Sequence, residues 1–158
     1  MEKAINQQIN REFYSAYLYL AMAQECESIG LKGSAKWFTL QYHEEISHGM
    51  KMIDYMNDQG ARVVLDAIEK PPVKFGPLVT MFEKTAEHER FVTKSIYSLV
   101  DLAIKEKDYA TQEFLQWFVK EQVEEESTDA DILARLRLAG DRGNALLMID
   151  SQLGKRTE

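Results

Sequence analysis

The chain has 158 residues, 45% of them apolar and 28% charged, which suits one domain that spans the whole chain and buries a sizeable core. Its 19 basic and 26 acidic residues give a net charge of −7, which argues against nucleic-acid binding and favours attraction of cations, although ordinary solubility explains the same charge. No run of 18 apolar residues and no signal-peptide pattern occur, so we expect a soluble cytoplasmic protein without a membrane span.

A glycine turn separates the first two predicted helices. Residues 3–29 contain neither Gly nor Pro and keep a helical period, and Gly30 is placed to end this helix. A second helical period covers residues 34–59, where Ser34 is a candidate N-cap and Gly60 ends the helix. The sequence therefore predicts two consecutive long helices of similar length.

A long connection without helical period follows Gly60. It contains all three prolines and continues to Pro77. About 17 extended residues reach roughly 50 Å, whereas a helix of about 25 residues is roughly 38 Å long. The connection can therefore run back along a helix, which would make the second and third helices parallel.

Three further helices are predicted after this connection. The third covers residues 77–107, with Pro77 at its first position, and the fourth covers residues 109–139, with Asp108 as its N-cap. A short amphipathic helix over residues 144–153 completes the chain. It has no partner within a finished four-helix bundle, so it suggests contacts between subunits.

Each of the four long helices carries an acid in the middle of its apolar stripe. These acids are Glu12, Glu45, Glu89 and Glu125. A lone ionised carboxylate in an apolar core is costly, so such groups take up a proton, pair with a cation or bind a metal. Antiparallel pairing would bring all four to a similar depth. Because Glu45 and His48 lie one turn apart, they can bind the same ion, and we predict a metal site inside the bundle.

The acids only partly match the pattern of di-iron helical bundles. That pattern has one Glu from each of two helices and a Glu-x-x-His from each of the other two. The fourth helix offers Gln122-x-x-Glu125 in place of a second Glu-x-x-His. We therefore expect a weaker, more labile second metal position, and Fe(II), Mn(II) or another exchangeable divalent ion rather than structural zinc.

Several segments resemble the non-haem ferritins of bacteria and archaea. These segments are residues 11–19 (REFYSAYLY), 43–48 (HEEISH), 88–89 (HE) and 114–126 (FLQWFVKEQVEEE). The resemblance extends over essentially the whole chain and implies an all-α, ferritin-like four-helix bundle with a long crossover and a short fifth helix. It also implies an iron-storage protein with ferroxidase activity, which oxidises Fe(II) with O2 or H2O2. The Fe(III) mineral would be stored inside a hollow shell of 24 identical subunits.

The resemblance assigns the ligands of two irons at a ferroxidase centre. It places the first iron at Glu12, Glu45 and His48. It places the second at Glu45, Glu89 and Glu125, with Gln122 beside it, so that Glu45 bridges the two ions. These residues would be both the ligands of the iron and the catalytic residues of its oxidation.

The resemblance also implies a third iron site and two aromatic neighbours. The third site would comprise Glu44, Glu121 and Glu124 and would share Glu125, although these positions also fit a solvated helix face. Tyr19 corresponds to the tyrosine beside the centre and Trp117 to its neighbouring tryptophan. Both also fit ordinary core aromatics.

Departures from related families limit what can be carried over. Ile46 and Thr128 stand where bacterioferritins have a haem-ligating Met and a His, so we expect no haem. Gln112 and Leu115 stand where vertebrate ferritins have channel acids, which leaves the route of iron into a shell open. Asp129, one turn beyond Glu125 on the inward stripe, either faces water or perturbs the site.

Two alternatives from other functional classes remain open on the sequence. The first is a di-iron or di-manganese peroxidase or oxygenase without mineral storage. Rubrerythrin-like members of that class usually carry a Cys-x-x-Cys module, which a chain with Cys26 alone cannot build. The second is a metal-free interaction bundle in which the buried acids fix the register of the helices.

Overall fold

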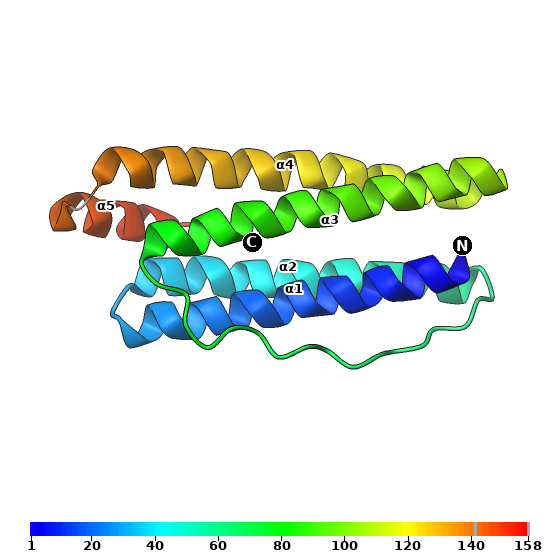
Figure 1. Cartoon of the computed structure of the whole chain (residues 1–158), viewed down its shortest axis with the longest axis horizontal. Helices are drawn as coiled ribbons and strands as arrows, with labels where there is room; N and C mark the ends of the chain where they lie inside the picture. The colour runs from blue at the N-terminus through cyan, green and yellow to red at the C-terminus, as the bar shows by residue number, and fades with distance from the viewer. Residues whose placement is uncertain (141, 158) are drawn as a thin grey trace.

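A computed structural model describes residues 1–140 and 142–157, and these residues form four long helices and one short helix (Figure 1). In chain order they are α1 (Glu2–Ser28), α2 (Lys32–Asp58), α3 (Leu78–Glu106), α4 (Tyr109–Ala139) and α5 (Gly143–Leu153). No strand occurs in the described residues, and the predicted all-α bundle with a fifth helix is confirmed. α3 begins one residue later than predicted, because Pro77 is its N-cap residue. Within the described part of the chain, no helix combines the length and apolar character needed to cross a membrane.

The connection between α2 and α3 runs along the outside of the bundle from one end to the other (Figure 1). Asn6 and Asn10 on α1 hold it in place. Asn6 Nδ2 donates to the backbone oxygen of Arg62 at 3.0 Å and its Oδ1 accepts from the Val64 amide at 2.7 Å. Asn10 Nδ2 donates to the backbone oxygen of Ala67 at 3.0 Å. Consequently α2 and α3 begin at the same end and run parallel, as the length of the connection predicts.

The turns at the helix ends follow local chemistry. After α1, Gly30 adopts φ +83°, a left-handed conformation that side chains disfavour, and the Leu31 amide donates back to the Cys26 oxygen at 2.9 Å. At the start of α4, Asp108 Oδ1 accepts from the Thr111 amide at 3.0 Å and Oδ2 accepts from its hydroxyl at 2.6 Å. The N-cap role predicted for Asp108 is therefore confirmed.

The start of α2 differs from the prediction. The helix begins at Lys32, so the N-cap assigned to Ser34 is wrong, and the capping carboxylate comes from Asp150 on α5. Asp150 accepts from the Gly33 amide at 3.1 Å, the Ser34 amide at 2.7 Å and the Ser34 hydroxyl at 2.7 Å. A Cβ on Gly33 would lie 1.8 Å from the Asp150 backbone oxygen, so only glycine permits this close approach. No local spacing reveals a cap that lies more than one hundred residues away.

The short helix α5 has one docked face and one free face. Ile149, Asp150 and Leu153 are buried against the bundle, whereas Leu147 and Met148 are 59% and 66% exposed. The expectation that this helix lacks a partner within the bundle is therefore wrong for its buried face. Its exposed apolar face remains available for contacts with other subunits.

We expect Asp150→Ala to lower the free energy of unfolding by about 1–3 kcal/mol, because the start of α2 loses its capping carboxylate. Amide hydrogen exchange should become faster in α5 than in the long helices, since the substitution undocks α5 first. Asp131→Ala is the matched control, because Asp131 is exposed and pairs with Arg135 on its own helix. Equal losses of thermal stability in both variants would contradict this assignment.

The core consists of two apolar clusters with a polar layer between them. The cluster nearer α5 includes Tyr19, Met22, Phe38 and Phe82, and the other includes Ile9, Met52, Ile96 and Phe118. Between them lie the four mid-stripe acids, which we call the four-acid layer: Glu12, Glu45, Glu89 and Glu125. Their exposed fractions are 1%, 2%, 1% and 7%. Each long helix thus contributes one buried carboxylate, at the depth that the stripes predict.

Candidate metal centre

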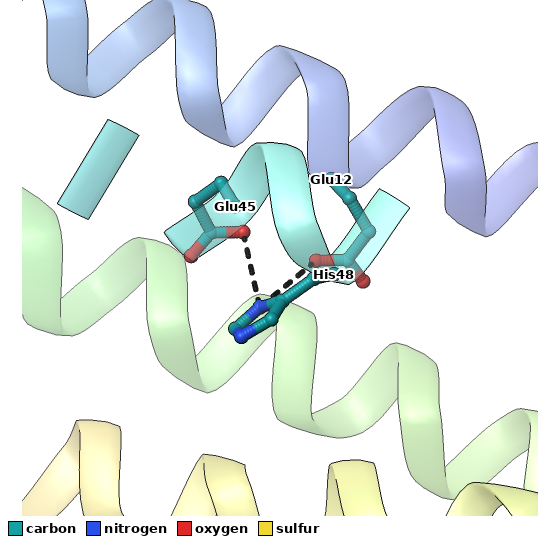
Figure 2. A group of neighbouring side chains, drawn as sticks. All are labelled: Glu12, Glu45 and His48. Carbon is teal, nitrogen blue, oxygen red and sulfur yellow. Dashed lines mark ion pairs between the residues drawn. The ribbon is translucent and has the colours of Figure 1, made fainter. Parts of the chain in front are cut away.

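One compact group of metal-ligating side chains lies in the four-acid layer (Figure 2). Glu12 comes from α1, and Glu45 and His48 come from adjacent turns of α2. His48 Nδ1 lies 3.8 Å from Glu12 Oε2 and 3.7 Å from Glu45 Oε2. Ligand atoms that each lie about 2.1 Å from one ion are separated by roughly 3–4 Å, so the three side chains fit around a divalent ion.

Glu45 has an unsatisfied oxygen. Its Oε2 is buried and has no hydrogen-bond partner among the described residues. Burial raises the pKa of Glu45 well above its ordinary value, and the neighbouring charges of Glu89 and Glu12 raise it further. A bound cation would both satisfy this oxygen and offset the repulsion among the carboxylates.

The orientation of Glu12 is fixed by a neighbouring amide. Gln8 Nε2 donates to Glu12 Oε1 at 2.7 Å. The Gln8 carbonyl accepts from Arg11 Nη1 at 3.2 Å and from the Ser95 hydroxyl, so the amide can present only its NH2 group to the carboxylate. This arrangement leaves Glu12 Oε2 directed towards His48.

Glu89 is held by two donors. Tyr19, which is fully buried, donates its hydroxyl to Glu89 Oε1, and Gln122 Nε2 donates to Oε2 at 3.1 Å. Burial raises the pKa of Glu89 to about 7, and the hydrogen bonds from Tyr19 and Gln122 limit the rise. Burial also raises the pKa of Tyr19 well above its ordinary value, so this phenol keeps its proton in the metal-free protein.

Glu125 is the remaining acid of the layer. Its Oε1 accepts from Gln41 Nε2 at 2.8 Å. Burial raises the pKa of Glu125 to about 8, with a further contribution from the charge of Glu89. Glu45, Glu89 and Glu125 are thus coupled electrostatically, although their ligand atoms are not gathered as closely as those of the first group.

The acids of the expected third site are spread out. Among residues 1–140 and 142–157, only Glu12, Glu45 and His48 form a group with ligand atoms within 4.8 Å of one another. Glu44 is about half-exposed and pairs with Arg156, Glu121 is partly exposed and Glu124 is exposed. In the described structure these three acids do not form one compact group.

The C-terminal segment reaches this side of the centre. Arg156 Nη1 donates to Gln41 Oε1 at 2.9 Å, Nη2 donates to Glu44, and the guanidinium lies 5.0 Å from the centre of the Trp37 ring. Because Gln41 accepts from Arg156 and donates to Glu125, its amide has one fixed orientation. The sequence does give a signal that Gln41 belongs to the site, because it is a polar residue on an inward apolar stripe. Arg156 lies beyond the last helix, where periodicity gives no signal.

Trp117 lies at the edge of the centre rather than in the core. Its ring is 37% exposed and meets the His48 ring edge-on, with centroids 5.4 Å apart. Lys51 Nζ lies 4.4 Å from the centre of the Trp117 ring. The interpretation of Trp117 as an ordinary core aromatic is therefore wrong. Tyr19, in contrast, is completely buried, as a core aromatic would be.

This donor set is suited to binding and oxidising hard cations. Four buried carboxylates and one imidazole favour divalent ions of the first transition series, and carboxylates stabilise the trivalent state more than the divalent one. The carboxylates therefore lower the reduction potential of a bound ion. On the Glu89 and Glu125 side, the Gln122 amide adds a neutral group to the two carboxylates.

Comparisons with known proteins agree with this geometry. A family model described as a ferritin-like domain matches residues 2–139. A bacterial non-heme ferritin of Bacteroides fragilis is 44% identical over 156 residues, covering 99% of this chain and 97% of the relative, and that of Campylobacter jejuni is 41% identical over 151 residues, covering 96% and 90%. An open-pore ferritin from the hyperthermophilic archaeon Archaeoglobus fulgidus superimposes with a TM-score of 0.98 at 50% identity, covering 99% of this chain and 97% of that one. The chain therefore belongs to the ferritin-like domain family.

Proposed function

We propose that this protein stores iron and oxidises it at a ferroxidase centre in the four-acid layer. The observation that carries the proposal is the buried group of Glu12, Glu45 and His48. Its spacing suits one ion, and Glu45 Oε2 has no hydrogen-bond partner in the part of the chain that the structure describes. Iron is the substrate in this proposal. Relatives with 41% and 44% identity that are named bacterial non-heme ferritins support the same choice of metal.

The residues divide into two iron positions with one shared ligand. Glu12 and His48 hold the first Fe(II), Glu89 and Glu125 hold the second, and Glu45 lies between them. Two Fe(II) ions together supply two electrons, which with two protons reduce O2 to H2O2, or H2O2 to two molecules of water. Tyr19 donates a hydrogen bond to Glu89 and thereby orients that ligand.

Product release follows from the asymmetry of the ligands. The first position has an imidazole and two carboxylates, whereas the second has three carboxylates and no imidazole, with the neutral Gln122 beside it. The missing imidazole makes this position more labile and allows Fe(III) to leave towards a mineral. Glu44, Glu121 and Glu124 would then form a third, transient position on the way out.

Arg156 competes with iron for that third position, because its guanidinium already pairs with Glu44. We expect Arg156→Gln to tighten binding of a third ion by roughly 3- to 10-fold, since a pair of this kind contributes about 1 kcal/mol. Zn(II) titration calorimetry measures the effect. Arg135→Gln is the matched control, because Arg135 is exposed and contacts Asp131 and Gln152, which lie outside the third site. Unchanged affinities in the Arg156 variant would remove Glu44 from the third site.

The proposed assembly is a cytoplasmic, hollow shell of 24 identical subunits without haem. The exposed apolar side chains Leu138, Leu147 and Met148 near the C-terminal end support extensive contacts between subunits. The proposed partners are Fe(II), Fe(III) and O2 or H2O2, with no nucleic acid and no membrane.

Aerobic iron loading tests the storage proposal. Fe(II) is added to metal-free protein, Fe(III) formation is followed by absorbance, and the product is separated by size-exclusion chromatography with iron analysis. A storage protein gives rapid oxidation and iron far in excess of the ligand sites, co-eluting with a large shell. Turnover with about two retained irons per chain would instead indicate a di-iron peroxidase or oxygenase.

A further inference from the structure

Asp129 is a buried carboxylate that the proposed ferroxidase centre does not use. It lies on α4, one turn beyond Glu125 on the same inward face, and its side chain is 1% exposed. Of the two alternatives that the sequence leaves open for Asp129, the one in which it faces water is therefore wrong. Neither Oδ1 nor Oδ2 has a hydrogen-bond partner among the described residues.

The surroundings of Asp129 make this lack of partners unusual. Glu89 on α3 and Glu126 on α4 add negative charge, and Arg90 on α3 and Arg156 of the C-terminal segment add positive charge. Neither arginine comes within 4.0 Å of the Asp129 carboxylate in the described structure. Asp129 in turn contributes to the raised pKa of Glu125 and of Tyr19, and it lies with Glu125 among the buried residues of α4.

A buried carboxylate with two free oxygens has three ways to be satisfied. It can bind a proton, an ordered water or a cation. A proton leaves the second oxygen without a partner, and a single water leaves the repulsion from Glu89 and Glu125 without compensation. A cation satisfies both oxygens and also offsets the repulsion from Glu89 and Glu125.

Glu125 is placed to share such a cation. Residues four apart on a helix lie on the same face in successive turns, so the Glu125 and Asp129 carboxylates are neighbours on α4. Glu125 uses only Oε1 in its hydrogen bond with Gln41. Its other oxygen and both oxygens of Asp129 form a set of hard donors, which suits a divalent ion such as Fe(II), Mn(II) or Zn(II).

We propose that Asp129 and Glu125 form an additional cation subsite between the four-acid layer and the apolar cluster nearer α5. This subsite differs from the proposed third site, because Glu44, Glu121 and Glu124 take no part in it. Its use by iron rests on the proposed function, whereas its ability to bind a divalent cation does not. For iron, it offers a position one helical turn away from the centre in the direction of α5.

Zn(II) provides the probe, because it binds carboxylate sites and does not change oxidation state. Metal-free Asp129→Asn is compared with wild type by titration calorimetry and by anomalous diffraction from crystals soaked in Zn(II). Asparagine keeps the shape of the side chain and removes its charge. Asp101→Asn is the matched control, because Asp101 is exposed on α3.

The expected result is a Zn(II) peak between Asp129 and Glu125 in wild type and in Asp101→Asn. In Asp129→Asn, this peak disappears and the affinity of the corresponding step falls at least about tenfold. The peak at Glu12, Glu45 and His48 remains in all three proteins. This last peak serves as the internal standard for folding and loading.

Two other outcomes separate the inference from the proposed function. A peak at Glu12, Glu45 and His48 with none at Asp129, and equal titrations for both Asp variants, would overturn the subsite and leave the ferroxidase centre intact. A peak at Asp129 with none at Glu12, Glu45 and His48 would support the subsite and contradict the proposed centre.

Discussion

Glu45→Ala is expected to slow the rapid phase of Fe(II) oxidation by about 100-fold or more. Glu45 is the ligand that we propose the two iron positions share, and its Oε2 has no hydrogen-bond partner among the described residues. Loss of an outer residue that merely orients a metal ligand already costs about 10- to 100-fold in affinity or activity, so loss of a shared ligand should cost at least as much. Stopped-flow absorbance after mixing Fe(II) with oxygenated protein measures the rate.

The control must show that the variant is folded. Burial raises the pKa of Glu45 well above its ordinary value, so removing this carboxylate should leave the melting temperature of the metal-free protein unchanged or higher. Glu45→Gln keeps the volume of the side chain, and Glu113→Gln makes the same change at an exposed position of α4. Oxidation by Glu45→Ala at the wild-type rate would rule out Glu45 as a ligand.

The metal-free protein is expected to become less stable as the pH rises from about 5 to about 8. Burial raises the pKa of Glu89 to about 7 and the pKa values of Glu125 and Asp129 to about 8. In the unfolded chain these groups lose their protons near their ordinary values, so the folded protein binds more protons across this interval. The stabilising contribution of these groups is therefore fully present below their ordinary pKa values and is lost as the pH rises through the raised ones.

Thermal unfolding of metal-free protein at fixed concentration, at pH 5, 6, 7 and 8, measures this dependence. Glu125→Gln should reduce the slope, whereas Glu113→Gln should not. Added Zn(II) should reverse the slope, because ions bind the deprotonated carboxylates more tightly at higher pH. A melting temperature that rises steadily from pH 5 to pH 8 without metal would show that the acids are not strained by burial.

Much of the fold could be predicted because its determinants are local. The helical period and the glycine turns locate the long helices, and Asp108 caps α4 through a residue three positions away. The mid-stripe acids were also visible, since a carboxylate at a position that calls for Leu or Phe stands out against its neighbours. Their burial in one layer confirms the depth that the spacing indicates.

The features that sequence reasoning missed depend on contacts between distant segments. Ser34 has the composition of an N-cap, but the carboxylate of Asp150 caps α2 instead. Arg156 reaches Gln41 and Glu44 from a segment without periodicity. Asp129 could be located on the inward stripe, but only the packed structure shows that both of its oxygens lack partners.

The most direct test of the proposed centre is anomalous diffraction at the iron edge from crystals soaked in Fe(II) without oxygen. A ferroxidase centre in the four-acid layer predicts a strong peak enclosed by Glu12, Glu45 and His48 and a weaker peak beside Glu89 and Glu125, with Glu45 between them. Iron found only on exposed acids, with no peak inside the bundle, would contradict it.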